Sequence, residues 1–119
     1  MGRNGWTFLT NHGHVLVCLA TDSGTLLRDV AVRVGITERA VQQIVADLED
    51  AGVIERMRVG RRNQYVVRRD KAFRHRVEAG VTIGDFIDLV HSGRDRRARR
   101  RSSDLLDTGG ATHVERAPC

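Results

Sequence analysis

The stretch TERAVQQIVADLEDAG, residues 37–52, has an apolar side and a polar side when it is wound as a helix. At 3.6 residues per turn, the apolar stripe consists of Val41, Ile44, Val45 and Leu48. The opposite side carries Arg39, Gln42, Gln43 and Ala46. The pattern predicts a helix whose apolar side lies in a core. It raises the question of which partner binds the opposite side, the polar front, which consists of Arg, two Gln and one small residue.

The segment before this stretch, TLLRDVAVRVG, predicts a second helix and a tight corner. Its apolar residues recur at helical spacing, and the small Ala31 in the stripe lets another helix cross closely. Gly35 can supply a left-handed C-cap, Ile36 can fill the corner, and Thr37 can cap the next helix. The sequence therefore predicts helix, short turn and helix.

A first helix is expected upstream. Thr10 or Asn11 can cap it, and it runs to about Thr21. Its residues are apolar almost all round, so it is expected to be buried on more than one side, and the second side can be a subunit contact.

Residues 53–68, VIERMRVGRRNQYVVR, have the composition of two strands. Gly60 and Asn63 both tolerate positive φ and bracket Arg61 and Arg62, which predicts a hairpin with an arginine-rich tip. The alternation in the first strand is imperfect, so the register stays open.

A further helix begins with a capping box, Thr82 with Asp85, and is expected to end at Ser92 and Gly93. Beyond it, RDRRARRR has no apolar partners and cannot bury itself, so we expect an Arg-rich disordered tail over residues 92–119.

These elements predict the fold class α+β, mainly helical: a winged helix-turn-helix domain over residues 6–91. It has a three-helix core, a two-stranded wing and one extra C-terminal helix. In such a unit the second helix of the turn lies in the DNA major groove. We therefore expect helix 37–51 in the major groove and the wing, residues 58–64, on the backbone or in the minor groove.

The chemistry of the polar front agrees with this placement, because in the major groove Gln can form two hydrogen bonds with adenine, and Arg can form two with guanine. The acidic residues Asp47, Glu49 and Asp50 would repel phosphates, so only the first two turns are expected to enter. The candidate DNA-binding residues are Thr37, Arg39, Gln42, Gln43, Arg58, Arg61, Arg62 and Asn63.

Composition narrows the function. The 119 residues carry a formal net charge of +5, and Lys71 is the only lysine. Residues 92–119 hold +3 of this charge. A basic, arginine-rich chain favours a polyanion such as double-stranded DNA. The sequence contains no Gly-rich phosphate loop, carboxylate pair or nucleophile elbow, so no enzymatic activity and no cofactor are expected.

Two cysteines, Cys18 and Cys119, form neither a disulfide framework nor a zinc motif, which favours a reducing cytoplasm. The sequence shows no signal peptide, no apolar run of membrane-spanning length and no sign of a small-molecule ligand. We expect a cytoplasmic, nucleoid-associated protein that forms a homodimer.

The stretch LRDVAVRVGITERAVQQIVADLEDAGVIERMRVGRRNQYVV resembles the winged-helix core of the MarR and ArsR-type bacterial transcriptional regulators. The wider stretch from Trp6 to His91 is similar to small actinobacterial regulators of that superfamily. The resemblance implies base contacts at Thr37, Arg39, Gln42 and Gln43, and a wing tip at residues 61–63. The long flanking helices of a MarR-type dimer and the ArsR cysteine motif are missing, so it implies DNA binding but no ligand.

Two alternatives remain open. A winged helix can serve protein–protein contact alone, although such domains usually lose the basic wing tip and the Gln/Arg front. His12, His14 and Cys18 could form a metal or redox sensor, since His14 and Cys18 are four residues apart on the first helix. Apolar neighbours would keep the Cys18 thiol unreactive, which argues against the redox form.

Overall fold

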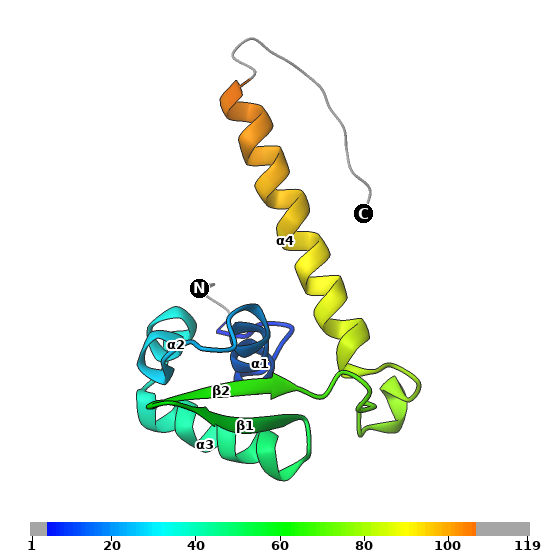
Figure 1. Ribbon diagram of the computed structural model, residues 1–119. Coiled ribbons are helices and arrows are strands. Elements are labelled where there is room, and N and C mark those ends of the chain that lie inside the picture. The colour runs from blue at the N-terminus through cyan, green and yellow to red at the C-terminus, as the bar shows by residue number, and fades with distance from the viewer. Residues whose placement is uncertain (1–4, 107–119) are drawn as a thin grey trace. The chain divides into compact units, whose positions relative to one another are not determined.

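In the computed structural model, residues 5–106 are described. Along the chain the elements are α1 (Asn11–Thr21), α2 (Leu27–Val34), α3 (Glu38–Asp50), β1 (Ile54–Val59), β2 (Arg62–Val67), the 3-10 helix η1 (Arg76–Glu78) and α4 (Ile83–Leu106). Figure 1 shows the β1–β2 hairpin beside α1, α2 and α3. The expected three-helix core with a two-stranded wing is confirmed.

Local capping sets where the first three helices begin and end. The Thr10 hydroxyl accepts a hydrogen bond from the Gly13 N–H at 3.2 Å, which starts α1. Gly35 has φ +86° and donates its N–H to the Ala31 carbonyl at 2.8 Å, so α2 ends in the predicted left-handed cap. Thr37 accepts from the Ala40 N–H at 3.0 Å and starts α3. The predicted corner between α2 and α3 is therefore confirmed.

The apolar stripes of the helices and the wing meet in one core. The buried residues are Val15, Leu16, Cys18, Leu19, Val30, Ala31, Val41, Ile44, Val45, Leu48, Val53, Ile54, Tyr65, Ile83 and Ile87. Every predicted core residue of α3 is among them. Because burial of apolar surface supplies most of the stabilisation of a domain this small, the core fixes which side of α3 remains outside.

The wing is a two-residue hairpin whose register the sequence left open. Ile54 pairs with Val67 and Val59 with Arg62, so the loop consists of Gly60 and Arg61 alone. Gly60 has φ +63°, as a tight hairpin turn requires. The expectation that Asn63 belongs to the tip is wrong, because Asn63 lies within β2 opposite Arg58. On its other edge, β2 has a second partner, since the Tyr65 N–H donates to the Ser23 carbonyl at 3.0 Å.

The segment after the wing is held by backbone contacts around an isolated bridge between Ala72 and Thr82. The predicted capping box is confirmed: the Thr82 N–H donates to Asp85 Oδ2, and the Asp85 N–H donates to Thr82 Oγ1, both at 3.1 Å.

The structure differs from the sequence-based expectation beyond Ser92. Helix α4 continues to Leu106, where we expected a disordered tail from residue 92 onwards; residues 107–119 lie outside the described part of the chain. Arginine and alanine are strong helix formers that need no buried face to be helical. The Arg96 guanidinium also donates to the Ser92 hydroxyl one turn earlier, at 3.2 Å.

The chain divides into two compact units between Ile87 and Asp88. The first contains α1 to α3, the wing and the capped start of α4. The second contains the arginine-rich part of α4. Among the helices of residues 5–106, none combines the length and the apolar character needed to cross a membrane.

Candidate DNA interface

The polar front of α3 is exposed along its first two turns. Arg39, Gln42 and Gln43 are all exposed, whereas Val41, Ile44 and Val45 behind them are buried. Arg39 and Gln42 make no side-chain hydrogen bond or ion pair with any other residue of the described part of the chain. Their donors and acceptors are therefore available to an external partner.

Thr37 stands at the start of this front but already has a structural task. Its hydroxyl oxygen accepts the Ala40 N–H and caps α3. The hydroxyl hydrogen remains available, so Thr37 can still donate one hydrogen bond to a phosphate, while its value as a base-reading side chain is reduced.

A groove of about 460 Å³ lies between the start of α2, one side of α3 and the wing. It brings together four predicted site residues: Gln42, Arg61, Arg62 and Asn63. The remaining lining residues are Thr25, Leu26, Leu27, Glu38, Val45, Arg56 and Tyr65. The lining contains three arginines and one glutamate. Because Arg56 is paired with Glu49, the excess of positive charge that favours an anion comes from Arg61 and Arg62. Thr37, Arg39, Gln43 and Arg58 do not line it.

The three wing arginines have different surroundings. Arg61, in the two-residue tip, is exposed and makes no hydrogen bond within residues 5–106. Arg62 is anchored, because its Nη2 donates to the Gly24 carbonyl at 2.8 Å, in the turn between α1 and α2. Within the described part of the chain, the side chain of Arg58 makes one contact, a long one from Nε to the Gly60 carbonyl at 3.4 Å.

The acidic end of α3 is less repulsive than the sequence suggests. Glu49 binds Arg56 of β1 through two hydrogen bonds, of 2.6 Å and 3.1 Å. This pairing raises the pKa of Arg56 above its ordinary value. Asp47 is also engaged, by His12 and Gln43, which leaves Asp50 as the exposed carboxylate of this helix end without a partner among the described residues.

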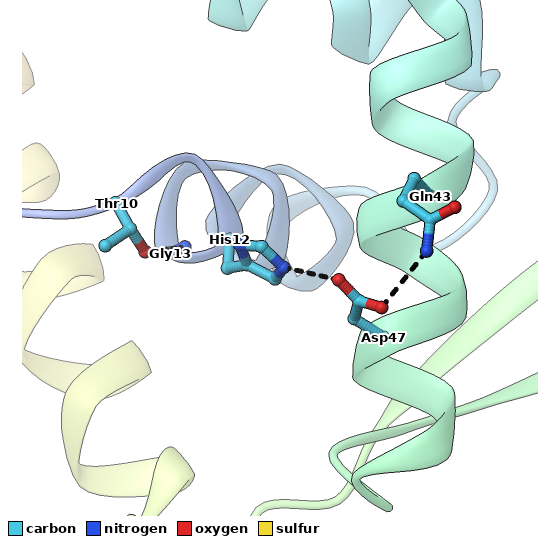
Figure 2. Close-up of polar contacts among 5 residues, drawn as sticks. All are labelled: Thr10, His12, Gly13, Gln43 and Asp47. Atoms are coloured by element: carbon cyan, nitrogen blue, oxygen red, sulfur yellow. Dashed lines mark hydrogen bonds and ion pairs between the residues drawn. The ribbon is translucent and has the colours of Figure 1, made fainter.

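Figure 2 shows a chain of polar contacts that joins α1 to α3. His12 Nε2 lies 2.8 Å from Asp47 Oδ2, and Gln43 Nε2 donates to Asp47 Oδ1 at 3.3 Å. A carboxylate can only accept, so both His12 and Gln43 donate. The hydrogen bond from His12, and then that from Gln43, lower the pKa of Asp47 below its ordinary value. Asp47 therefore remains ionised and holds both partners.

The structure separates the residues of the alternative metal or redox site. His12 is bound to Asp47, His14 lies 3.2 Å from the Thr7 hydroxyl, and Cys18 is buried in the core. Within residues 5–106, no group of three or more His, Cys, Asp or Glu side chains is placed to hold a metal ion.

The comparisons with known proteins agree with this geometry. Residues 9–55 match the family model described as winged helix-turn-helix DNA-binding. This span holds α1, α2, α3 and the first two residues of β1. The chain therefore carries a winged helix-turn-helix DNA-binding domain, the kind of domain on which many transcriptional regulators are built.

Two solved structures are similar in fold. One is a MarR family protein of Mycobacterium tuberculosis, determined with salicylic acid, at 20% identity and a TM-score of 0.49, covering 84% of this chain and 76% of that one. The other is T. potens IscR, at 21% identity and a TM-score of 0.44, covering 90% of this chain and 84% of that one. No curated protein matches the chain.

Sequence reasoning missed the contributions of Arg56, Thr25 and His12 to this region. Arg56 looked like an ordinary strand residue, and Thr25 preceded a helix. The contact of His12 with Asp47 joins residues 35 positions apart, and the place of Thr25 in the groove depends on how the turn before α2 packs beside the wing, whereas Arg56 pairs with Glu49 only seven positions away. The sequence signal for Arg56 was that it lies seven positions after Glu49, at the acidic end of α3.

The Asp47 contacts make a prediction about pH. Because the pKa of Asp47 is lowered in the folded state, its contribution to stability is present above its unfolded pKa and is lost as pH falls through the lower, folded value. Urea unfolding of the wild type and of Asp47→Asn should therefore converge in free energy as pH falls from about 5 to about 2. Asp50→Asn is the matched control, since it removes a carboxylate that has no partner within residues 5–106. A difference between wild type and Asp47→Asn that stays constant over this range would contradict the prediction.

Proposed function

We propose that this protein is a sequence-specific transcriptional regulator that binds double-stranded DNA. Helix α3 enters the major groove, and the wing, residues 58–64, contacts the backbone or the adjacent minor groove. The observation that carries the proposal is the exposed front of Arg39, Gln42 and Gln43, directly opposite the buried stripe of the same helix. These side chains have the donors and acceptors that distinguish base pairs in the major groove.

The groove beside Gln42 supports the same placement. A sugar-phosphate strand that passes between α3 and the wing would meet Arg61 and Arg62 on one wall and Thr25 on another. Phosphate contacts of this kind fix the register of a protein on DNA, while base contacts specify the sequence. Within this proposal, Arg61, Arg62, Asn63 and Arg58 position the protein, and Arg39, Gln42 and Gln43 read the bases.

We also propose that the protein acts as a homodimer in the bacterial cytoplasm. The actinobacterial resemblance implies a small regulator of this kind, and we propose that it has no enzymatic activity. The apolar residues of α1 that suggested a subunit contact, Val15, Leu16 and Leu19, are buried within the single chain. Trp6 and Phe8, which precede α1 in the sequence, are exposed apolar side chains whose rings lie 5.8 Å apart. A dimer contact at this pair would bury the two aromatic rings, which are exposed in the single chain.

Selection of bound fragments from random DNA tests both proposals. We expect enrichment of a defined sequence, and, for a two-fold dimer, a pseudo-palindromic site with half-sites about one turn, ~34 Å, apart. Sedimentation at micromolar concentration should show the dimer. A pool with no enriched sequence would refute the sequence-specific function. This is the result expected of a winged helix that serves only protein–protein contact. A monomer on a non-repeated site would refute the dimer alone.

A further inference from the structure

The contacts of Gln43 distinguish it from the other polar residues on the front of α3. Gln43 is exposed, yet its Nε2 donates to Asp47 Oδ1, and the second carboxylate oxygen of Asp47 is held by His12. Neither Arg39 nor Gln42 has such a partner within residues 5–106. The residue that supplies the far end of this chain of contacts, His12, belongs to α1 and lies 35 positions before Asp47.

A glutamine side chain that is free in water exchanges its donor and acceptor by rotating the carboxamide. An ionised carboxylate only accepts, so Asp47 selects the orientation in which Gln43 turns its amino group toward the carboxylate. The carbonyl oxygen and the second N–H of Gln43 then have no partner within residues 5–106, and the orientation of the carboxamide fixes which of the two positions presents the acceptor. His12, in turn, restricts the rotation of the Asp47 carboxylate, because one of its two oxygens is already bound.

We propose that His12 and Asp47 determine the base specificity of Gln43 by holding its carboxamide with the carbonyl oxygen available to DNA. Resting on the function proposed above, this assigns Gln43 an acceptor role in the major groove. An acceptor matches a base with an exocyclic amino group, which is adenine or cytosine, and it is repelled by the carbonyl oxygens of guanine and thymine. Asp47 and His12 are positioning residues, since they act on DNA only through Gln43.

Two simpler roles for Asp47 predict different behaviour. If Asp47 only repels phosphates, its removal strengthens binding to every sequence equally. If the His12–Asp47 contact only ties α1 to α3, its removal lowers thermal stability and leaves base preference unchanged. A change in preference at a single base pair is expected only if Asp47 orients Gln43.

The first experiment needs no DNA. In amide NMR spectra of the full chain, the side-chain NH₂ signals of Gln43 should be distinct from those of a solvated glutamine such as Gln42. In Asp47→Ala they should collapse toward the solvated values, and in His12→Ala they should move part of the way. Asp50→Ala is the charge-matched control and should leave them in place. Gln43 signals that are already those of a solvated side chain in the wild type would overturn the proposal, whatever the protein binds.

The second experiment measures the ratio of affinities for the selected site and for sites with the Gln43 base pair exchanged. Asp47→Ala should reduce this ratio about fivefold, the lower end of what a base contact contributes. His12→Ala should reduce it less, and Asp50→Ala should leave it unchanged. In a Gln43→Ala background, adding Asp47→Ala should cause no further change in the ratio. Thermal melting of each variant checks that the fold is kept.

The outcomes separate the two levels of the argument. A wild type without any base preference refutes the proposed function and this inference together. The wild type can show a base preference that Asp47→Ala leaves intact, or one that Asp47→Ala changes by the same factor in the Gln43→Ala background as in the wild type. Either result refutes the inference and leaves the proposed function standing.

Discussion

Replacing the six arginines of residues 94–101 with glutamine should weaken binding to every DNA sequence and flatten its dependence on salt. Each phosphate contact that is lost should reduce the log–log slope by ~0.9, so a loss of most contacts would reduce it by about 3 to 5. The segment carries six arginines and one acid, Asp95, in a helical part of the chain. We expect these arginines to contact phosphates, which carry no sequence information, so their effect should be independent of sequence.

Glutamine is the suitable replacement because its helix propensity is close to that of arginine, so the variant keeps the length and helical tendency of α4. Salt titrations on the selected site and on scrambled DNA provide the measurement. Deleting residues 93–119 should give the same two results. Unchanged slopes in both variants would mean that this segment does not contact DNA.

The wing arginines should behave differently, and the structure separates them. Arg62 is anchored on the Gly24 carbonyl, so its other N–H groups are held in place, whereas Arg61 makes no hydrogen bond with any described residue. An ordered contact forms only in the correct register, so Arg62→Ala should lower the ratio of specific to non-specific affinity more than Arg61→Ala does. If the arginine-rich part of α4 changes that ratio more than the wing does, the two basic clusters have been assigned the wrong way round.

Alanine at Arg39 or Gln42 should cost about 1–3 kcal/mol of binding free energy on the selected site, or roughly 5- to 150-fold in affinity. Both side chains are exposed on the front of α3 and have no partner to lose within residues 5–106. Truncation should therefore remove a base contact without unfolding the helix, and preference should relax at one or two base pairs.

Competition binding against all single-base exchanges of the site measures this effect. Arg33→Ala is the matched control for Arg39→Ala, because Arg33 is an exposed arginine at the end of α2, outside the polar front. It removes the same charge and should lower affinity for all sequences alike. If Arg39→Ala and Gln42→Ala leave the base preference unchanged, as we expect for Arg33→Ala, α3 is not the helix that reads the sequence.

Most of the fold could be predicted because the decisive signals are local. The caps at Gly35 and Thr37 and the box of Thr82 with Asp85 each involve residues within four positions of one another, so the sequence displays them directly. The periodic stripe of α3 likewise predicts which side is buried. The expectation of disorder is wrong over residues 92–106, because a segment without an apolar stripe can still be helical when its arginines have high helix propensity.

The candidate site was predicted in composition but not in arrangement. The sequence by itself determined that α3 has an exposed front of Arg39, Gln42 and Gln43, since helical periodicity requires it. Only the tertiary structure decided that Arg62 is anchored on Gly24, 38 positions away, and that Gln43 is held through Asp47 by His12. Such contacts depend on how α1 and the wing pack against the rest of the core. No spacing in the sequence encodes them, because the distance between two side chains across a core is set by the packing of all the residues between them.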